Sequence, residues 1–138
     1  MMINNTLLFL SALLVGSIPA AFGQQTGRMI RLSEIEIAPT YLEAYKAILA
    51  EESAASVKLE PGVIAIFPMY QKANPTSVRI LEIYADRAAY EQHLKTPHFQ
   101  TYKTTTLKMV TSLKLIDMES TDAATMPLIF KKATGDNR

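Results

Sequence analysis

EIYADRAAYEQHLKTPHFQTY, residues 82–102, is the stretch on which the interpretation of the chain depends. It begins as the end of a strand and continues as a short helix, a proline joint and a second helix. Asp86 can cap the first helix, because its carboxylate accepts hydrogen bonds from free backbone amides. Thr96 and Pro97 suit the cap and the first position of the second helix. Both histidines of the chain, His93 and His98, lie here, so this stretch is the first place to search for chemistry.

The elements around this stretch predict a fold class. Alternating apolar residues indicate strands, and proline, glycine and capping residues mark the ends of helices. The order strand, helix, strand, strand, helix, strand is that of a ferredoxin-like sandwich, an α+β fold (β-α-β-β-α-β) with an antiparallel sheet. The expected strands are residues 28–37, 63–71, 77–84 and 113–119; the long helix starts at Pro39-Thr40 and stops at Pro61-Gly62, and the two short helices end near Met109.

Two local patterns carry more specific expectations. Thr40 and Glu43 have the spacing of a capping box, in which each side chain bonds the backbone amide of the other. The apolar alternation of residues 28–37 changes phase near Ser33. A bulge would explain that change, and so would a strand buried on both faces.

Composition limits the classes of function. The chain has 138 residues, of which 49% are hydrophobic and 20% charged, as expected for one globular domain. The formal net charge is +1 and no basic cluster is present, so nucleic acid is not an expected partner. There is no cysteine, which excludes disulfides, thiolate metal sites and cysteine nucleophiles.

The N-terminal residues predict export. Residues 6–18 are an uncharged apolar run, followed by Ala21-x-Gly23, a small-residue cleavage pattern. A short membrane anchor is the alternative, but the run is shorter than the roughly 20 residues that span a bilayer. We expect a periplasmic or secreted protein with no stable membrane anchor after cleavage. The expected parts are a signal peptide (1–23), a linker (24–28), the domain (29–119) and a tail (120–138), in which Met126–Phe130 is either a fifth strand that adds to a neighbouring subunit or a loose segment.

The strand at residues 63–71 predicts association. Val63, Phe67 and Met69 lie on one side and Ile64, Ile66 and Tyr70 on the other, so both faces are apolar. Pro68 places this strand at a sheet edge or at a bulge, because proline cannot donate to a ladder. Helices in this topology cover only one face of the sheet, so we expect a homodimer that covers the other.

The candidate reactive groups are the histidines, a glutamate and four tyrosines. His93 can transfer protons near neutral pH, although a structural role bonded to Glu82 or to a backbone carbonyl is the alternative. Glu82, if it points inward, needs a partner such as Arg79, Lys103 or a histidine. His98 is expected to be structural. The tyrosines are expected to pack with their hydroxyls at the rim of a pocket: Tyr70, Tyr84, Tyr90 and Tyr102.

Several kinds of site are not expected. The sequence contains no phosphate-binding glycine loop, dinucleotide fingerprint or nucleophile elbow, and no motif for flavin. The two histidines have no carboxylate in metal-like register beside them in the sequence, so no metal site is predicted.

The run Tyr90-x-x-His93-Leu94-x-x-Pro97-His98-Phe99, with Glu82-x-Tyr84 before it and Glu60-Pro61-Gly62 upstream, resembles the antibiotic biosynthesis monooxygenase (ABM) domain. The similarity covers residues 29–119. This family includes quinol monooxygenases, which oxidise quinols and polycyclic phenols with molecular oxygen and without a cofactor. It pairs two sandwiches into a dimeric α/β barrel. A haem-degrading branch is disfavoured, because there is no tryptophan and Lys103 falls where the axial histidine would be.

The resemblance implies roles for particular residues. His93 would be the base, with Tyr84 and Glu82 as the other catalytic residues. The substrate would be a small, quinol-like aromatic molecule. Its binding residues would be Tyr70, Tyr90, His98, Phe99 and Tyr102. The alternative is a non-catalytic dimeric module of the same fold that binds a small ligand or acts in stress, since a fold does not fix a function.

Overall fold

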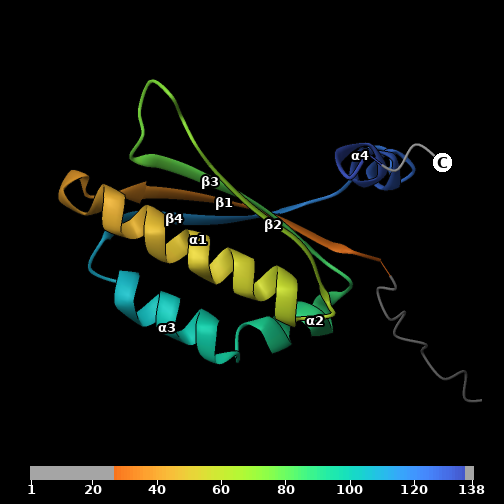
Figure 1. The fold of residues 1–138 in the computed structure, drawn as a ribbon, viewed down its shortest axis with the longest axis horizontal. Helices are drawn as coiled ribbons and strands as arrows, with labels where there is room; N and C mark the ends of the chain where they lie inside the picture. The colour runs from red at the N-terminus through yellow and green to blue at the C-terminus, as the bar shows by residue number, and fades with distance from the viewer. Residues whose placement is uncertain (1–26, 136–138) are drawn as a thin grey trace, which may run out of the picture.

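A computed structural model describes residues 27–135 as an antiparallel sheet covered on one face by helices (Figure 1). The predicted signal peptide, 1–23, lies outside the described residues. The strand order is β2-β3-β1-β4, so the ferredoxin-like α+β prediction is confirmed and β2, with Pro68, is an edge strand as expected. The elements are β1 (Met29–Ile37), a 3-10 turn η1 (Pro39–Tyr41), α1 (Leu42–Leu59), β2 (Val63–Tyr70), β3 (Ser77–Tyr84), α2 (Arg87–His93), α3 (Pro97–Thr106), β4 (Val110–Met118) and α4 (Thr125–Ala133).

The long helix α1 begins later than predicted. Pro39–Tyr41 forms a 3-10 turn, and α1 starts at Leu42 without a side-chain cap, so the predicted capping box of Thr40 and Glu43 is wrong. Proline suits the tighter turn because its fixed φ favours the first position of a helical segment. The helix buries Tyr45 and Leu49 against the sheet, in a core with Ile35, Ile37, Val78, Ile80 and Met109.

The two short helices form as the sequence predicts. The Asp86 carboxylate accepts from the Ala89 backbone amide, and Thr96 caps α3 with Pro97 in its first turn. α3 ends at Thr106 and β4 begins at Val110, each about three residues earlier than expected. Gly62 has a steric role, because a Cβ there would lie 2.5 Å from the Ala89 Cβ. The chain leaving α1 can therefore pass close against α2.

Strand β1 is regular through Ser33, so the prediction of a bulge there is wrong. Its register with β3 and β4 runs without a shift from Ile30 to Glu36. Arg31 and Ser33 point inward with Ile35 and Ile37, and all four are buried. The apparent change of phase is therefore two polar side chains on the inner face.

The outer face of the sheet carries two apolar rows that cross all four strands. Residues directly opposite each other in antiparallel strands share a face. The rows are Phe67, Leu81, Leu32, Ile116 and Ala65, Ile83, Ile30, Met118. Phe67 is 59% exposed and Met118 46%. Helices α1, α2 and α3 lie on the other side of the sheet (Figure 1).

The Met126–Phe130 segment of the tail forms neither the predicted fifth strand nor a loose segment. Met126–Phe130 lies within the helix α4, which leaves Leu128, Ile129 and Phe130 exposed. Figure 1 shows α4 apart from α1, α2 and α3. Among residues 27–135, no helix has the length and apolarity to cross a membrane.

Candidate active site

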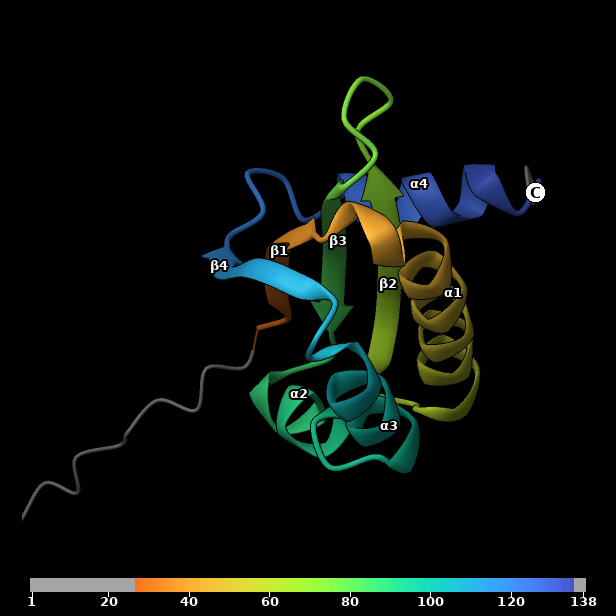
Figure 2. The ribbon, with the colours of Figure 1, turned by 90° about the vertical axis from the view of Figure 1, so that its left-hand side faces the viewer.

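A cavity of about 400 Å³ separates the inner face of the sheet from the helices. Its wall is largely apolar, with Ile35, Leu49, Ile66, Ile80, Leu113 and Leu115 among the residues that form it. Leu113 and Leu115 line the cavity from β4 and are 56% and 50% exposed, so the cavity is open on that side. Figure 2 shows β4 at the edge of the sheet far from α1.

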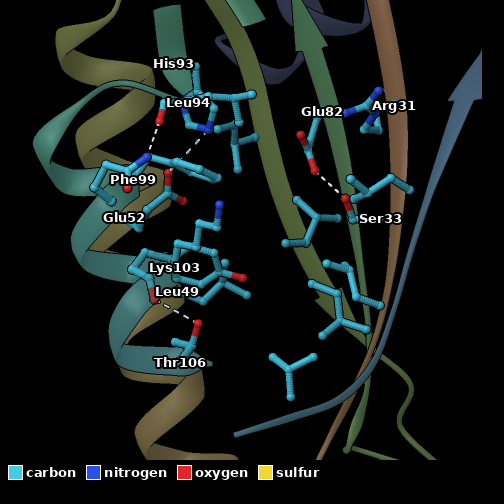
Figure 3. A pocket seen from close by; sticks show the side chains of 18 of the residues that line it. Arg31, Ser33, Leu49, Glu52, Glu82, His93, Leu94, Phe99, Lys103 and Thr106 are labelled. Atoms are coloured by element: carbon cyan, nitrogen blue, oxygen red, sulfur yellow. Dashed lines mark hydrogen bonds and ion pairs between the residues drawn. The ribbon is translucent and has the colours of Figure 1, made fainter. Parts of the chain in front are cut away.

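Polar groups from both layers face each other across the cavity (Figure 3). Arg31, Ser33 and Glu82 come from the sheet, and Glu52, His93 and Lys103 come from the helices. Along the inner face of the sheet, the pairs Arg31–Glu82 and Arg31–Asp117 are polar, whereas Ile35 pairs with Val78 and Leu113. The cavity therefore has a polar end near α2 and an apolar end.

Glu60 holds both histidines. Its Oε1 lies 3.0 Å from His93 Nδ1 and 2.5 Å from His98 Nε2. Glu60 follows the last turn of α1, and the histidines lie on α2 and α3, so one carboxylate joins three helices. Burial raises the pKa of Glu60, but hydrogen bonds from His93 and His98 outweigh burial and hold the pKa below its usual value. Glu60 is therefore the ionised partner of this cluster.

Glu52 faces the other nitrogen of the same imidazole. Its Oε1 lies 3.8 Å from His93 Nε2 and accepts a 2.7 Å hydrogen bond from the Ser56 hydroxyl. The Glu52 side chain is 5% exposed and that of His93 is 3%. Burial raises the pKa of Glu52, and this exceeds the opposite effects of Ser56 and the histidines. His93 thus lies between two carboxyl groups: Glu60, which is ionised, and Glu52, whose burial favours the protonated, neutral form.

The partners of Glu82 differ from those expected. Its two oxygens accept from the Ser33 hydroxyl at 2.5 Å and from the Tyr84 hydroxyl at 2.7 Å. Arg79 instead lies on the outer face of the sheet beside Glu34 and Glu36. The expected Arg79 partner is therefore wrong, because Arg79 and Glu82 point to opposite faces of β3.

Arg31 is fixed at the rim of the polar end. Its guanidinium binds Asp117 Oδ1 at 2.7 and 2.9 Å and lies 4.4 Å from the centre of the Tyr90 ring. Burial lowers the pKa of Arg31, but the hydrogen bond with Asp117 and the nearby Tyr90 raise it further, so the net shift is upward. Arg31 stays charged and its charge is already paired.

The predicted aromatic residues take three positions: some line the cavity, Tyr84 is buried behind it, and Tyr70 lies outside it. Tyr90, Phe99 and Tyr102 line the cavity, and Phe99 packs 4.6 Å from the His93 ring, centre to centre. Burial, the largest cause, raises the pKa of Tyr102 to about 12, and its hydroxyl lies 2.7 Å from that of Tyr45. Tyr84 is fully buried behind Glu82 and His93, where burial raises its pKa.

Tyr70 and His98 do not line the cavity. Tyr70 is half exposed, and its ring lies 4.4 Å from Lys46 Nζ. His98 lies behind His93, on the other side of Glu60. The position of His98 suits the structural role expected for it, whereas a substrate contact by His98 or Tyr70 has no geometric support.

The comparisons with known proteins place this geometry in a family. The antibiotic biosynthesis monooxygenase family model matches residues 29–105. The chain belongs to this family. A solved structure of a proposed ABM from Bacteroides thetaiotaomicron is 50% identical to it, with a TM-score of 0.69, and the match covers 70% of this chain and 91% of that one.

Two further solved structures extend the comparison of this ABM protein. A proposed monooxygenase from Lactobacillus acidophilus is 28% identical, with a TM-score of 0.66, over 69% of this chain and 45% of that one. A proposed ABM from Nitrosomonas europaea, 19% identical with a TM-score of 0.67 over 72% of this chain and 95% of that one, shares the fold. No curated protein matched the chain.

The fold brings a carboxylate to the two histidines that their register in the sequence did not indicate. Glu60 is a carboxylate beside both histidines, and the ligand atoms of the three residues lie within 4.8 Å of one another. Its contacts with His93 and His98, 3.0 and 2.5 Å, are shorter than the ~3.3 Å that separates two ligands of a tetrahedral zinc ion. Hydrogen bonds account for these contacts, and the absence of a metal from this ABM protein stays a prediction.

Four residues of the candidate site were not singled out for chemistry from the sequence. Arg31 and Ser33 share the phase of Ile35 and Ile37, which is a signal that they face inward. Glu52 follows Tyr45 by seven residues, so it lies on the same face of α1. Glu60 stood only in the family motif, and nothing local in the sequence links it to two histidines more than thirty residues away.

Proposed function

We propose that this protein is a cofactor-independent monooxygenase that oxidises a quinol-like aromatic substrate with molecular oxygen. One observation carries the proposal. An apolar cavity ends at the buried imidazole of His93, whose Nδ1 atom is hydrogen-bonded to the ionised Glu60. Electron-rich phenols react with oxygen once they are deprotonated, so the protein must supply a fitted apolar cavity and a positioned base.

Glu60 selects the useful tautomer of His93. An ionised carboxylate can only accept, so the Nδ1 atom of His93 donates to it and carries a proton. The Nε2 atom, which is turned toward Glu52 at the cavity wall, is then free to accept a proton. The arrangement of carboxylate, imidazole and substrate hydroxyl follows the same logic as the orienting carboxylate of a serine hydrolase.

The substrate supplies all the electrons of the reaction. His93 removes a phenolic proton, and the phenolate passes one electron to oxygen. The resulting radical and superoxide combine to form a carbon–oxygen bond. One oxygen atom remains on the ring and the other leaves as water, so quinol and oxygen yield hydroxyquinone and water.

Lys103 is suited to stabilise the phenolate. It lines the cavity, and Figure 3 shows it on the helical side, opposite Ser33 and Glu82. A cation placed where negative charge develops lowers the barrier, and does so more effectively in an apolar site than in water. Arg31 is less suited, because Asp117 already neutralises it.

Oxygen uptake tests the proposal. Purified protein, treated with a chelator and checked for bound flavin by absorbance, is mixed with menadiol-type quinols, and uptake is measured against protein-free autoxidation. We expect protein-dependent uptake and a product heavier than the quinone by one oxygen atom. Saturable binding without uptake would replace the proposal with a non-catalytic ligand-binding module.

We further propose a homodimer formed through the outer face of the sheet. The support is the two apolar rows that cross all four strands there, which water would otherwise contact. Light scattering at micromolar concentration should give twice the mass of the mature chain. Phe67→Asp places a charge at the exposed β2 end of one row and should shift the protein toward monomer. Leu59→Asp is the matched control, because Leu59 is 64% exposed and ends α1, on the other side of the sheet (Figure 1). A monomeric wild-type protein would contradict the proposal.

A further inference from the structure

Glu52 is a buried carboxyl group that the reaction above leaves without a role. Its side chain is 5% exposed and lines the cavity, so it meets any molecule bound there. A structural carboxylate of this depth normally has a cation beside it, because burying an unpaired charge is unfavourable. The groups that Glu52 contacts are instead the Ser56 hydroxyl at 2.7 Å and His93 Nε2 at 3.8 Å.

We propose that Glu52 is the second proton-transfer group of the site: it protonates the peroxide formed on the substrate ring and then removes the ring proton. This inference rests on the proposed function. Its basis is position, because Glu52 and His93 face the same cavity and lie close enough to act on the same bound peroxide.

The two groups together balance every proton of the reaction. His93 first takes the phenolic proton. After the ring carbon and oxygen have bonded, Glu52 gives its proton to the outer peroxide oxygen. The Glu52 carboxylate then takes the ring C–H proton. The electron pair of that C–H bond forms the new carbonyl as the O–O bond breaks. The leaving hydroxide takes the proton from His93, so water departs and both residues return to their starting states.

The surroundings of Glu52 favour the protonated start that this cycle needs. Ser56 from α1, His93 from α2 and His98 from α3 lower its pKa, whereas Glu60 raises it, and burial exceeds them all. Glu82 and Lys103 face the same cavity from β3 and α3. A carboxylic acid kept neutral near pH 7 can donate a proton, as a general acid must.

The Glu52→Gln variant tests the inference, because glutamine keeps the shape and the hydrogen bond from Ser56 but cannot transfer a proton. With a menadiol-type quinol, we expect oxygen uptake to continue, hydroxylated product to fall at least ~10-fold and hydrogen peroxide to take its place. Glu43→Gln is the matched control on α1, since the Glu43 side chain is 83% exposed.

The outcomes separate this inference from the proposed function. If Glu52→Gln forms the hydroxylated product at the wild-type rate, Glu52 has no such role and the proposed function stands. If the wild-type protein consumes no oxygen with any quinol, both are overturned. Should Glu52→Gln fail to fold, the wild-type protein decides: the share of oxygen recovered as peroxide should rise with pH as the acid form of Glu52 is lost, and a constant share would overturn the inference.

Discussion

Glu60 and Glu52 lie on opposite sides of the His93 ring, and they differ in almost every physical respect. Glu60 accepts from two imidazoles and has a lowered pKa. Glu52 accepts from a serine hydroxyl, lies deeper, and has a raised pKa. The two residues are eight positions apart in the same part of the chain.

The difference shows how one residue type serves two purposes around a single base. Two hydrogen-bond donors outweigh the burial of Glu60, whereas the Ser56 hydroxyl and the nearby histidines together do not outweigh the deeper burial of Glu52. The ionised side fixes the orientation of the imidazole, and the neutral side keeps a proton next to the cavity. A pair of titratable groups whose environments push their pKa values apart is a common way to assign acid and base.

The largest effect is expected when the group between the two carboxylates is replaced. His93→Asn places an amide nitrogen near the position of Nδ1 and can still donate to Glu60, but it has no basic nitrogen near neutral pH. Turnover of a quinol should fall by about 10²–10⁴, the usual contribution of a positioned base. His98→Gln is the matched control, because His98 also bonds Glu60 but lies outside the cavity. It should change turnover by much less. Equal losses in the two variants would contradict the assignment of His93.

A smaller effect is expected when the end of α1, which carries Glu60, is pushed apart from α2. Gly62→Ala places a Cβ 2.5 Å from that of Ala89, so α2 must move away from the end of α1. We expect a loss of about 1–3 kcal/mol in the free energy of unfolding, as for other overpacked sites. Urea denaturation measures it. Gly27→Ala, with no atom within 4 Å of the added Cβ, should be neutral.

The smallest effects, of opposite sign, are expected in the pH dependence of stability. The pKa of Glu60 is lowered by folding, so its contribution is present above the unfolded pKa of about 4.3 and is lost as pH falls through the folded pKa. The pKa of Glu52 is raised, so its contribution is present below that unfolded pKa and is lost as pH rises through the folded value.

Denaturant unfolding across pH separates the two carboxylates. Glu60→Gln should lower stability most at neutral pH, and its curve should approach that of the wild type in acid. Glu52→Gln should do the reverse, with its largest deficit in acid and a smaller deficit, or a gain, near neutral pH. If both variants gave curves parallel to the wild type, the difference between the two sides of His93 would be lost.

Local signals predicted the fold well. Asp86, Thr96 and Pro97 mark real helix starts, and the bounds of β3 agree with the predicted strand to the residue. The errors arose where tertiary packing selects among local options. Pro39 favours a 3-10 turn over a capped helix, and Met126–Phe130 has an apolar composition that suits strand and helix equally.

The site was predictable only in part, because its decisive contacts join distant segments. His93, Glu82, Tyr90, Phe99 and Tyr102 were identified as candidates, and all five line the cavity. The contact of Glu60 with the two histidines and that of Glu52 with His93 depend on how α1 packs against α2 and α3. Periodicity places Glu52 on a face of α1 but does not say what lies opposite.

The exposure of β4 at Leu113 and Leu115 affects the size of molecule that the cavity admits. Leu113 and Leu115 border the cavity and are also open to water. If a ring binds with its hydroxyl at His93, as proposed, a substituent on the side of Leu113 and Leu115 would extend toward solvent. Length in that direction is not limited by the wall, so compounds with and without a hydrocarbon tail should be accepted alike, and selection should act on the ring.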